Sequence, residues 1–154
     1  MHYTTDTIDI INSAYTKRDA TKKLKLKLFN EKLKIGLVKI HPHMRTDELK
    51  HYENYHGIVV EGYGLAGLPI NQFDDATKEN TKLYTTLKAL AKKMPVVLTS
   101  QTIFGRVNMN VYSTGRKLQE AGVLGNLLAL TTETAYIKLA WLLSNHPKTK
   151  VKEL

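Results

Sequence analysis

Two stretches of the sequence gather residue types that bind polar ligands, and each follows a run of apolar residues. The first, residues 62–67, reads GYGLAG and fits the G-x-G-x-x-G pattern of dinucleotide-binding loops. Such a site needs a helix that opens inside the motif, so that its N-terminus meets the pyrophosphate. Here Pro69 follows, and helical periodicity returns only near Thr77. We therefore interpret the motif as a sharp backbone turn at a strand end.

The second stretch, residues 99–116, contains one glutamine, two asparagines, several hydroxyl groups and two of the chain's four arginines. A loop of this composition holds a polar ligand or forms a hydrogen-bonded contact between subunits. Neither stretch places a nucleophile beside a base, and the sequence contains no G-x-S-x-G or P-loop motif. The spacing of these residues therefore identifies no catalytic residue.

The residue types and spacings of the sequence do not indicate a metal site or a cofactor site. The sequence has no cysteine, which excludes disulfides, thiol catalysis and cysteine-held metal sites. The histidines at positions 41, 43, 51 and 56 do not have metal-ligand spacing, and we interpret them as surface residues. Asp74 and Asp75 precede an expected helix and are typical of its cap and first turn. We expect no cofactor and no metal ion.

The elements that position the two polar stretches alternate between strand and helix. Apolar runs predict strands at 35–40, 57–61 and 95–100. Helical periodicity and stop signals predict helices from Thr46 (with Thr46 as its cap), over 77–93, over 113–121 and over 132–144. This order predicts an α/β fold, a three-layer parallel sheet flanked by helices. Ligands gather in the loops beyond the carboxyl ends of such strands, which here are loops 61–72 and 99–112.

The N-terminal region has a different pattern. Residues 7–11 and 22–29 predict two short strands, and the second (KKLKLKLF) alternates lysine with leucine. We expect a hairpin-like arm or linker over 1–31, the α/β domain over 32–145 and a basic tail over 146–154. The net charge is +9, and residues 1–39 hold nine basic and four acidic residues. We interpret these lysines as a solvated surface; the alternative is a stand-alone RNA- or nucleotide-binding module.

The sequence has no apolar run long enough to span a membrane and no signal-peptide pattern at its start. We expect a cytoplasmic protein with no membrane partner.

A family resemblance is carried by four runs: 99–101 (TSQ), 105–108 (GRVN), 110–118 (NVYSTGRKL) and 121–123 (AGV). Together they resemble the C-terminal domain of the asparaginase/glutaminase family. Within that family they are most similar to the D subunits of archaeal glutamyl-tRNA(Gln) amidotransferases. The resemblance covers about residues 32–145 and implies that domain's α/β fold.

The resemblance also implies that the chemistry lies elsewhere. Enzymes of this family carry the nucleophilic threonine of a G-G-T-I-type motif in a larger N-terminal domain, and this sequence lacks that motif. We expect this chain to be inactive alone and to pair with an N-terminal catalytic chain. A naturally split gene is the preferred interpretation, because a methionine leads the charged arm; a cloned fragment would look alike.

The activity implied by the resemblance is hydrolysis of the side-chain amide of asparagine or glutamine, with release of ammonia. A threonine hydroxyl attacks the amide carbon, which requires an activating base and an oxyanion hole. Two versions remain open: a split L-asparaginase, or the ammonia-generating D subunit of a tRNA-dependent amidotransferase. The implied partners are the catalytic chain in a dimer of heterodimers and, in the second version, an amidotransferase partner subunit and tRNA.

The resemblance assigns two groups of candidate site residues and no catalytic residue. The loop expected to complete a substrate pocket or an interface contains Glu61, Gly62, Tyr63, Gly64 and Gly67. The family motif expected at an interface contains Ser100, Gln101, Arg106, Asn108, Asn110, Tyr112 and Arg116.

Overall fold

A three-stranded parallel sheet forms the centre of the protein in a computed structural model, which describes residues 2–3, 8–9 and 13–146. Its strands are β3 (Ile35–Lys39), β4 (Gly57–Gly62) and β5 (Val96–Ser100), in the order β3-β4-β5. The apolar run of β4 pairs on both sides, with Ile35 opposite Gly57 and Ile58 opposite Val96. A strand that is buried on both faces favours such a continuous apolar sequence.

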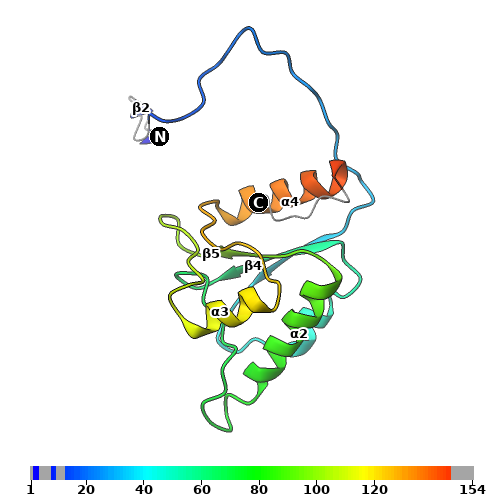
Figure 1. The fold of residues 1–154 in the computed structure, drawn as a ribbon, viewed down its shortest axis with the longest axis vertical. Helices are drawn as coiled ribbons and strands as arrows, with labels where there is room; N and C mark the ends of the chain where they lie inside the picture. The colour runs from blue at the N-terminus through cyan, green and yellow to red at the C-terminus, as the bar shows by residue number, and fades with distance from the viewer. Residues whose placement is uncertain (1, 4–7, 10–12, 147–154) are drawn as a thin grey trace.

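Four helices accompany the sheet: α1 (Thr46–Lys50), α2 (Glu79–Lys93), α3 (Ser113–Glu120) and α4 (Thr132–Asn145). Figure 1 shows α4 on one face of the sheet and α2 and α3 on the other. The predicted three-layer α/β fold is therefore confirmed. None of the helices in the described residues is long and apolar enough to cross a membrane.

The core lies between these layers. Leu83, Leu87 and Leu90 recur at helical spacing along α2 and are buried against the sheet, as the sequence pattern predicted. On the other face, Ala135 and Leu139 of α4 are buried. These side chains hold the strand ends, and the loops that follow them, in fixed positions.

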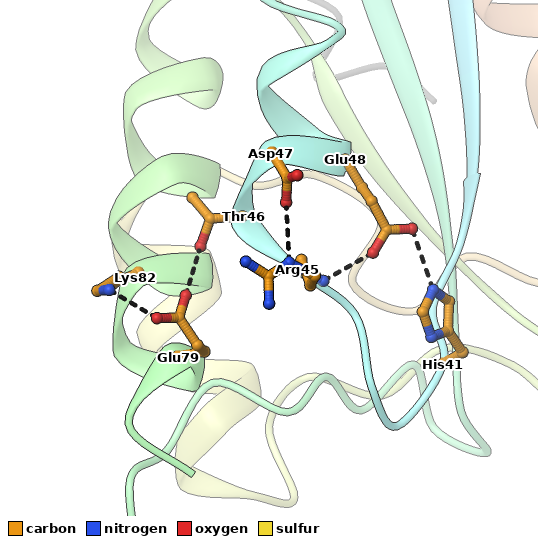
Figure 2. Close-up of polar contacts among 7 residues, drawn as sticks. All are labelled: His41, Arg45, Thr46, Asp47, Glu48, Glu79 and Lys82. Carbon is orange, nitrogen blue, oxygen red and sulfur yellow. Dashed lines mark hydrogen bonds and ion pairs between the residues drawn. The ribbon is translucent and has the colours of Figure 1, made fainter. Parts of the chain in front are cut away.

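The N-terminus of α1 differs from the prediction by one residue. The cap is Arg45 rather than Thr46, and its backbone N–H donates to Glu48 Oε1 over 2.7 Å. The other oxygen of Glu48 lies 3.1 Å from His41 Nε2 (Figure 2). The hydrogen bond from Arg45 and the contact with His41 lower the pKa of Glu48 from its ordinary value. Thr46 instead directs its hydroxyl towards Glu79 of α2, at 3.5 Å.

The acidic pair before α2 does not cap that helix as its position predicted, because the N-cap of α2 is Lys78 and makes no side-chain capping hydrogen bond. Asp74 Oδ1 accepts hydrogen bonds from the Thr77 backbone N–H over 2.9 Å and from the Thr77 hydroxyl over 2.7 Å. These hydrogen bonds lower the pKa of Asp74. They close a turn that leads into α2.

The N-terminal arm contradicts one prediction. Residues 22–29 form no strand, although their lysine–leucine alternation predicted one. In the described part of the arm, β1 (His2–Tyr3) pairs antiparallel with β2 (Ile8–Asp9) instead. The physical reason is that a half-buried strand needs a neighbouring strand and a surface to cover it, and 22–29 has neither here. Part of the predicted strand 7–11 and the tail after residue 146 lie outside the described residues.

Candidate functional site

The loops after β4 and β5 are joined by hydrogen bonds. The Ser100 hydroxyl donates to the carbonyl of Gly64 and, at 3.4 Å, to that of Tyr63. The backbone N–H of Gln101 donates to the Gly62 carbonyl over 2.9 Å. Parallel strands end at the same edge, and these hydrogen bonds show that the two polar stretches meet there.

Gly62 is needed because the first loop folds back closely on itself. A Cβ at this position would lie 2.9 Å from the Gly67 carbonyl oxygen and from the Ala66 carbonyl carbon. Gly64 and Gly67 would meet nothing within 4 Å, so these two glycines border open space. No helix opens in the motif, because α2 begins only at Glu79. This geometry supports the turn interpretation against a dinucleotide site.

The joined loops enclose a cleft of about 450 Å³. Its lining comes from both loops and consists of Tyr63, Gly64, Leu65, Gly67, Thr102, Phe104, Gly105, Arg106 and Tyr112. Arg106 forms no ion pair with any acid in the described part of the chain. The cleft therefore presents one unpaired positive charge, hydroxyl groups and aromatic surface.

One buried polar atom in this loop lacks a partner. Among the described residues, the Tyr63 hydroxyl is the only buried side-chain polar atom without a hydrogen bond. Burying such a group unpaired costs roughly 1–3 kcal/mol. The Tyr63 loop thus presents a donor and acceptor that the isolated chain does not satisfy.

The predicted site residues divide into two groups by position. Tyr63, Gly64, Gly67, Arg106 and Tyr112 line the cleft. The side chain of Glu61 instead pairs with Lys39, with 2.9 Å between Oε1 and Nζ.

The remaining motif residues brace the second loop rather than line the cleft. Arg116 Nη1 donates to the Asn110 carbonyl over 2.8 Å, and the Asn110 backbone N–H donates to Asn108 Oδ1 over 3.2 Å. Gln119 Nε2 donates to Asn110 Oδ1 over 3.0 Å. These bonds fix the path of the loop that carries Arg106 and Tyr112.

Four lining residues were not singled out from the sequence: Leu65, Thr102, Phe104 and Gly105. They lie inside the two polar stretches, but nothing in the sequence assigned them to a site. Only the contact between the loops identifies them.

The cleft lacks a group that activates a nucleophile. Among the residues that the structure describes, no lysine, histidine, aspartate or glutamate lines it. Its hydroxyl groups therefore have no base within the cleft to take their proton at neutral pH. The described residues also contain no cluster of three His, Cys, Asp or Glu that could hold a metal ion.

The chain was compared with known protein families and structures. Residues 34–154 match the profile described as the Glutaminase/Asparaginase C-terminal domain. The chain belongs to the glutaminase/asparaginase family. The match covers its C-terminal domain, and the family predicted from the sequence is thus confirmed.

Relatives of this domain include named archaeal proteins. The chain is 41% identical over 135 residues to the D subunit of the glutamyl-tRNA(Gln) amidotransferase of Methanobrevibacter smithii, covering 86% of this chain and 28% of that protein. It is 35% identical over 157 residues to the protein of the same name from Sulfolobus acidocaldarius, covering 100% of this chain and 32% of that protein. The chain therefore spans about a third of the length of these relatives.

Solved structures agree with this assignment. The thermostable L-asparaginase from Thermococcus kodakarensis is 30% identical, with a TM-score of 0.64 over 77% of this chain and 33% of that one. L-asparaginase I from Vibrio cholerae, at 24% identity and a TM-score of 0.57, shows the same fold over 73% of this chain and 32% of that one.

Proposed function

We propose that this chain is the C-terminal, non-nucleophilic part of an asparaginase-type amidohydrolase, which releases ammonia from the side-chain amide of asparagine or glutamine. The observation that carries the proposal is the match of residues 34–154 to the family's C-terminal domain, together with the likeness to the D subunits of amidotransferases. In this proposal the nucleophilic threonine belongs to a separate chain, the catalytic chain. Residues 32–145 form the domain, and residues 1–31 form the linker that faces the catalytic chain.

In this proposal, the catalytic chain forms one part of the substrate pocket, and the cleft of this chain forms the other part. Its missing base supports this role, because the reaction needs a base that the catalytic chain would supply. Arg106 is the charged group that the cleft offers to a substrate or to the partner, and the Tyr63 hydroxyl is a buried group that still lacks a hydrogen-bond partner. Gly64 and Gly67 leave room for either.

The proposed assembly is a dimer of heterodimers. The likeness to the D subunits of amidotransferases supports the version in which the ammonia is used by an amidotransferase partner subunit acting on tRNA. The likeness to an L-asparaginase structure keeps the free-standing enzyme as the second version.

Ammonia release from L-asparagine and L-glutamine tests the proposal directly. We expect no activity from this chain alone and activity after mixing with the catalytic chain. The preferred amide separates the two versions. Activity of this chain alone would contradict the proposal, as would an inactive mixture.

Substitution of Tyr63 tests the role of the cleft. Tyr63→Phe removes an unsatisfied hydroxyl, so the isolated chain should unfold no more easily than the wild type. If the hydroxyl is used in the complex, the same change lowers kcat/KM for ammonia release. Full activity of the Tyr63→Phe complex would remove this residue from the site. Phe73→Ser, in the loop before α2, is the control.

The alternative is a stand-alone RNA-binding module, supported by the exposed lysines of residues 22–27. Binding to RNA through phosphates would weaken steeply as salt is raised. A titration of tRNA at two salt concentrations separates this alternative from a chain that has no RNA affinity of its own.

A further inference from the structure

Three leucines of the arm have no cover in the described structure. Leu24, Leu26 and Leu28 are 88%, 73% and 72% exposed. They alternate with lysines along residues 22–29, which we name the Lys-Leu segment. Alternate side chains of an extended chain point to opposite sides. Pairing of this segment with another strand would therefore gather the leucines on one face and the lysines on the other.

The backbone of the Lys-Leu segment is also unpaired. From residue 23 to residue 27, no backbone N–H or carbonyl takes part in a hydrogen bond within the described part of the chain. A row of free backbone groups beside apolar side chains is a template for strand addition.

The base of the segment is held on α4. Asn145 Nδ2 donates to the Leu28 carbonyl over 3.2 Å, and the Asn30 backbone N–H donates to the Ser144 hydroxyl over 2.9 Å. Lys27 Nζ lies 5.5 Å from the centre of the Trp141 ring. Figure 1 shows the arm leaving the body at the C-terminal end of α4 and passing over the side of that helix that faces away from the sheet.

That side of α4 carries an apolar groove of about 490 Å³. Phe29, Ile137 and Trp141 supply its apolar lining, and Glu133 and Lys138 are its charged members. Phe29 joins this groove to the Lys-Leu segment, because it is the last residue of that segment. The two features therefore form one continuous surface.

We propose that this surface binds the catalytic chain, a strand of which pairs with residues 23–27 while apolar side chains of that chain cover the three leucines. The inference rests on the proposed function. In the Sulfolobus acidocaldarius relative, the similarity includes the whole of this chain, the Lys-Leu segment with it. The matched domain is the C-terminal domain of its family, and the Lys-Leu segment precedes it in the sequence. In the relatives, the segment therefore lies between this domain and the larger N-terminal part of the protein.

Charge selects this occupant over a second copy of the chain. The segment holds four lysines in a chain of net charge +9. Two identical segments paired side by side would bring like charges together, which destabilises a sheet. A strand of the catalytic chain avoids this repulsion if it carries acidic residues on the face that the lysines share and apolar residues on the face that the leucines share.

The test compares two variants in binding to the purified catalytic chain. The triple variant Leu24→Ser, Leu26→Ser, Leu28→Ser removes the apolar face. Phe73→Ser removes a side chain that is 82% exposed in the loop between β4 and α2, outside the Lys-Leu segment and the groove on α4. We expect the triple variant to raise Kd about 100-fold or more, and the control about twofold or less. Thermal unfolding verifies that both variants remain folded.

Hydrogen exchange distinguishes failure of this inference from failure of the proposed function. Binding should protect the amides of residues 23–27. An active mixture in which these amides still exchange freely, and in which the triple variant binds normally, would overturn the inference and leave the proposed function standing. An inactive mixture would overturn both. Protection that rises with the concentration of this chain alone would assign the surface to a second copy and also overturn the inference.

Discussion

Leucines of the body and leucines of the arm have opposite environments in the same chain. In the body, Leu87, Leu98 and Leu139 are enclosed between helices and sheet. In the arm, Leu24 and Leu26 lie almost fully exposed. An apolar pattern in the sequence predicts which side chains could be buried together. Whether they are buried depends on whether another helix or strand of the protein packs against them. The body supplies its own cover, and the arm does not.

The two regions therefore contribute differently to folding. An apolar side chain stabilises the folded state in proportion to the area it removes from water, about 25 cal/mol per Å². The body leucines lose nearly all of their solvent-accessible area on folding. The arm leucines remove little, so their apolar character is available to an intermolecular contact instead.

The largest effect is expected in the body. Leu98 is fully buried in β5, and its backbone N–H also donates to the Leu124 carbonyl over 2.8 Å. Leu98→Ala should lower the free energy of unfolding by about 2–5 kcal/mol, because a cavity remains beside the sheet. Denaturant unfolding measures the change. A loss as small as that of an exposed leucine would contradict the enclosed core.

A smaller effect is expected where polar groups meet inside the body. The hydroxyls of Thr99 in β5 and Thr132 in α4 lie 2.9 Å apart, and both residues are buried. Thr99→Val leaves the Thr132 hydroxyl unpaired and should cost roughly 1–3 kcal/mol. The double variant Thr99→Val, Thr132→Val should be more stable than that single variant, because neither hydroxyl remains. Additive losses in this double-mutant cycle would show that the pair is not coupled.

Much of the body could be predicted from sequence because its signals are local. The apolar runs of β4 and β5 and the spacing of Leu83, Leu87 and Leu90 each indicate an element by themselves. The cap of α1 was misplaced because Arg45 is not a typical capping residue; the Glu48 side chain accepts from its backbone instead.

The site and the arm depend on contacts that no local pattern contains. The contact of Ser100 with Gly64 joins loops that are distant in sequence, and Phe104 lines the cleft between these loops. The alternation of the Lys-Leu segment predicted a strand that the segment does not form in the described chain. It could not indicate that the pairing strand is missing from the described chain.

A weak pH-dependent effect is expected at the N-terminus of α1. Glu48 has a lowered pKa, so its charged form stabilises the fold above its ordinary value of 4.5, and this contribution is lost as pH falls through the lower folded value. Its side chain is 45% exposed, so solvent screens most of the gain. Glu48→Gln keeps an acceptor for the Arg45 N–H and should cost no more than about 0.5 kcal/mol at pH 7.

Unfolding at pH 7 and at pH 3 measures this contribution. The difference between the wild type and the Glu48→Gln variant should shrink towards the acidic pH, because the carboxyl group binds its proton as the pH falls through its lowered pKa. A difference that persists undiminished there would assign the effect to packing rather than to charge.

The smallest effect on the isolated chain is expected in the arm, and it completes the comparison with the body. Leu26→Ala should change the free energy of unfolding by no more than about 0.5 kcal/mol, because the side chain is already in water in the folded state. The same change in the complex with the catalytic chain should cost binding affinity, since the leucine would be buried there. Leu98→Ala should show the reverse order, with a large loss in the isolated chain. If Leu26→Ala destabilised the isolated chain as strongly as a core variant, the arm would be packed in solution, and its leucines would not be free to bind a partner.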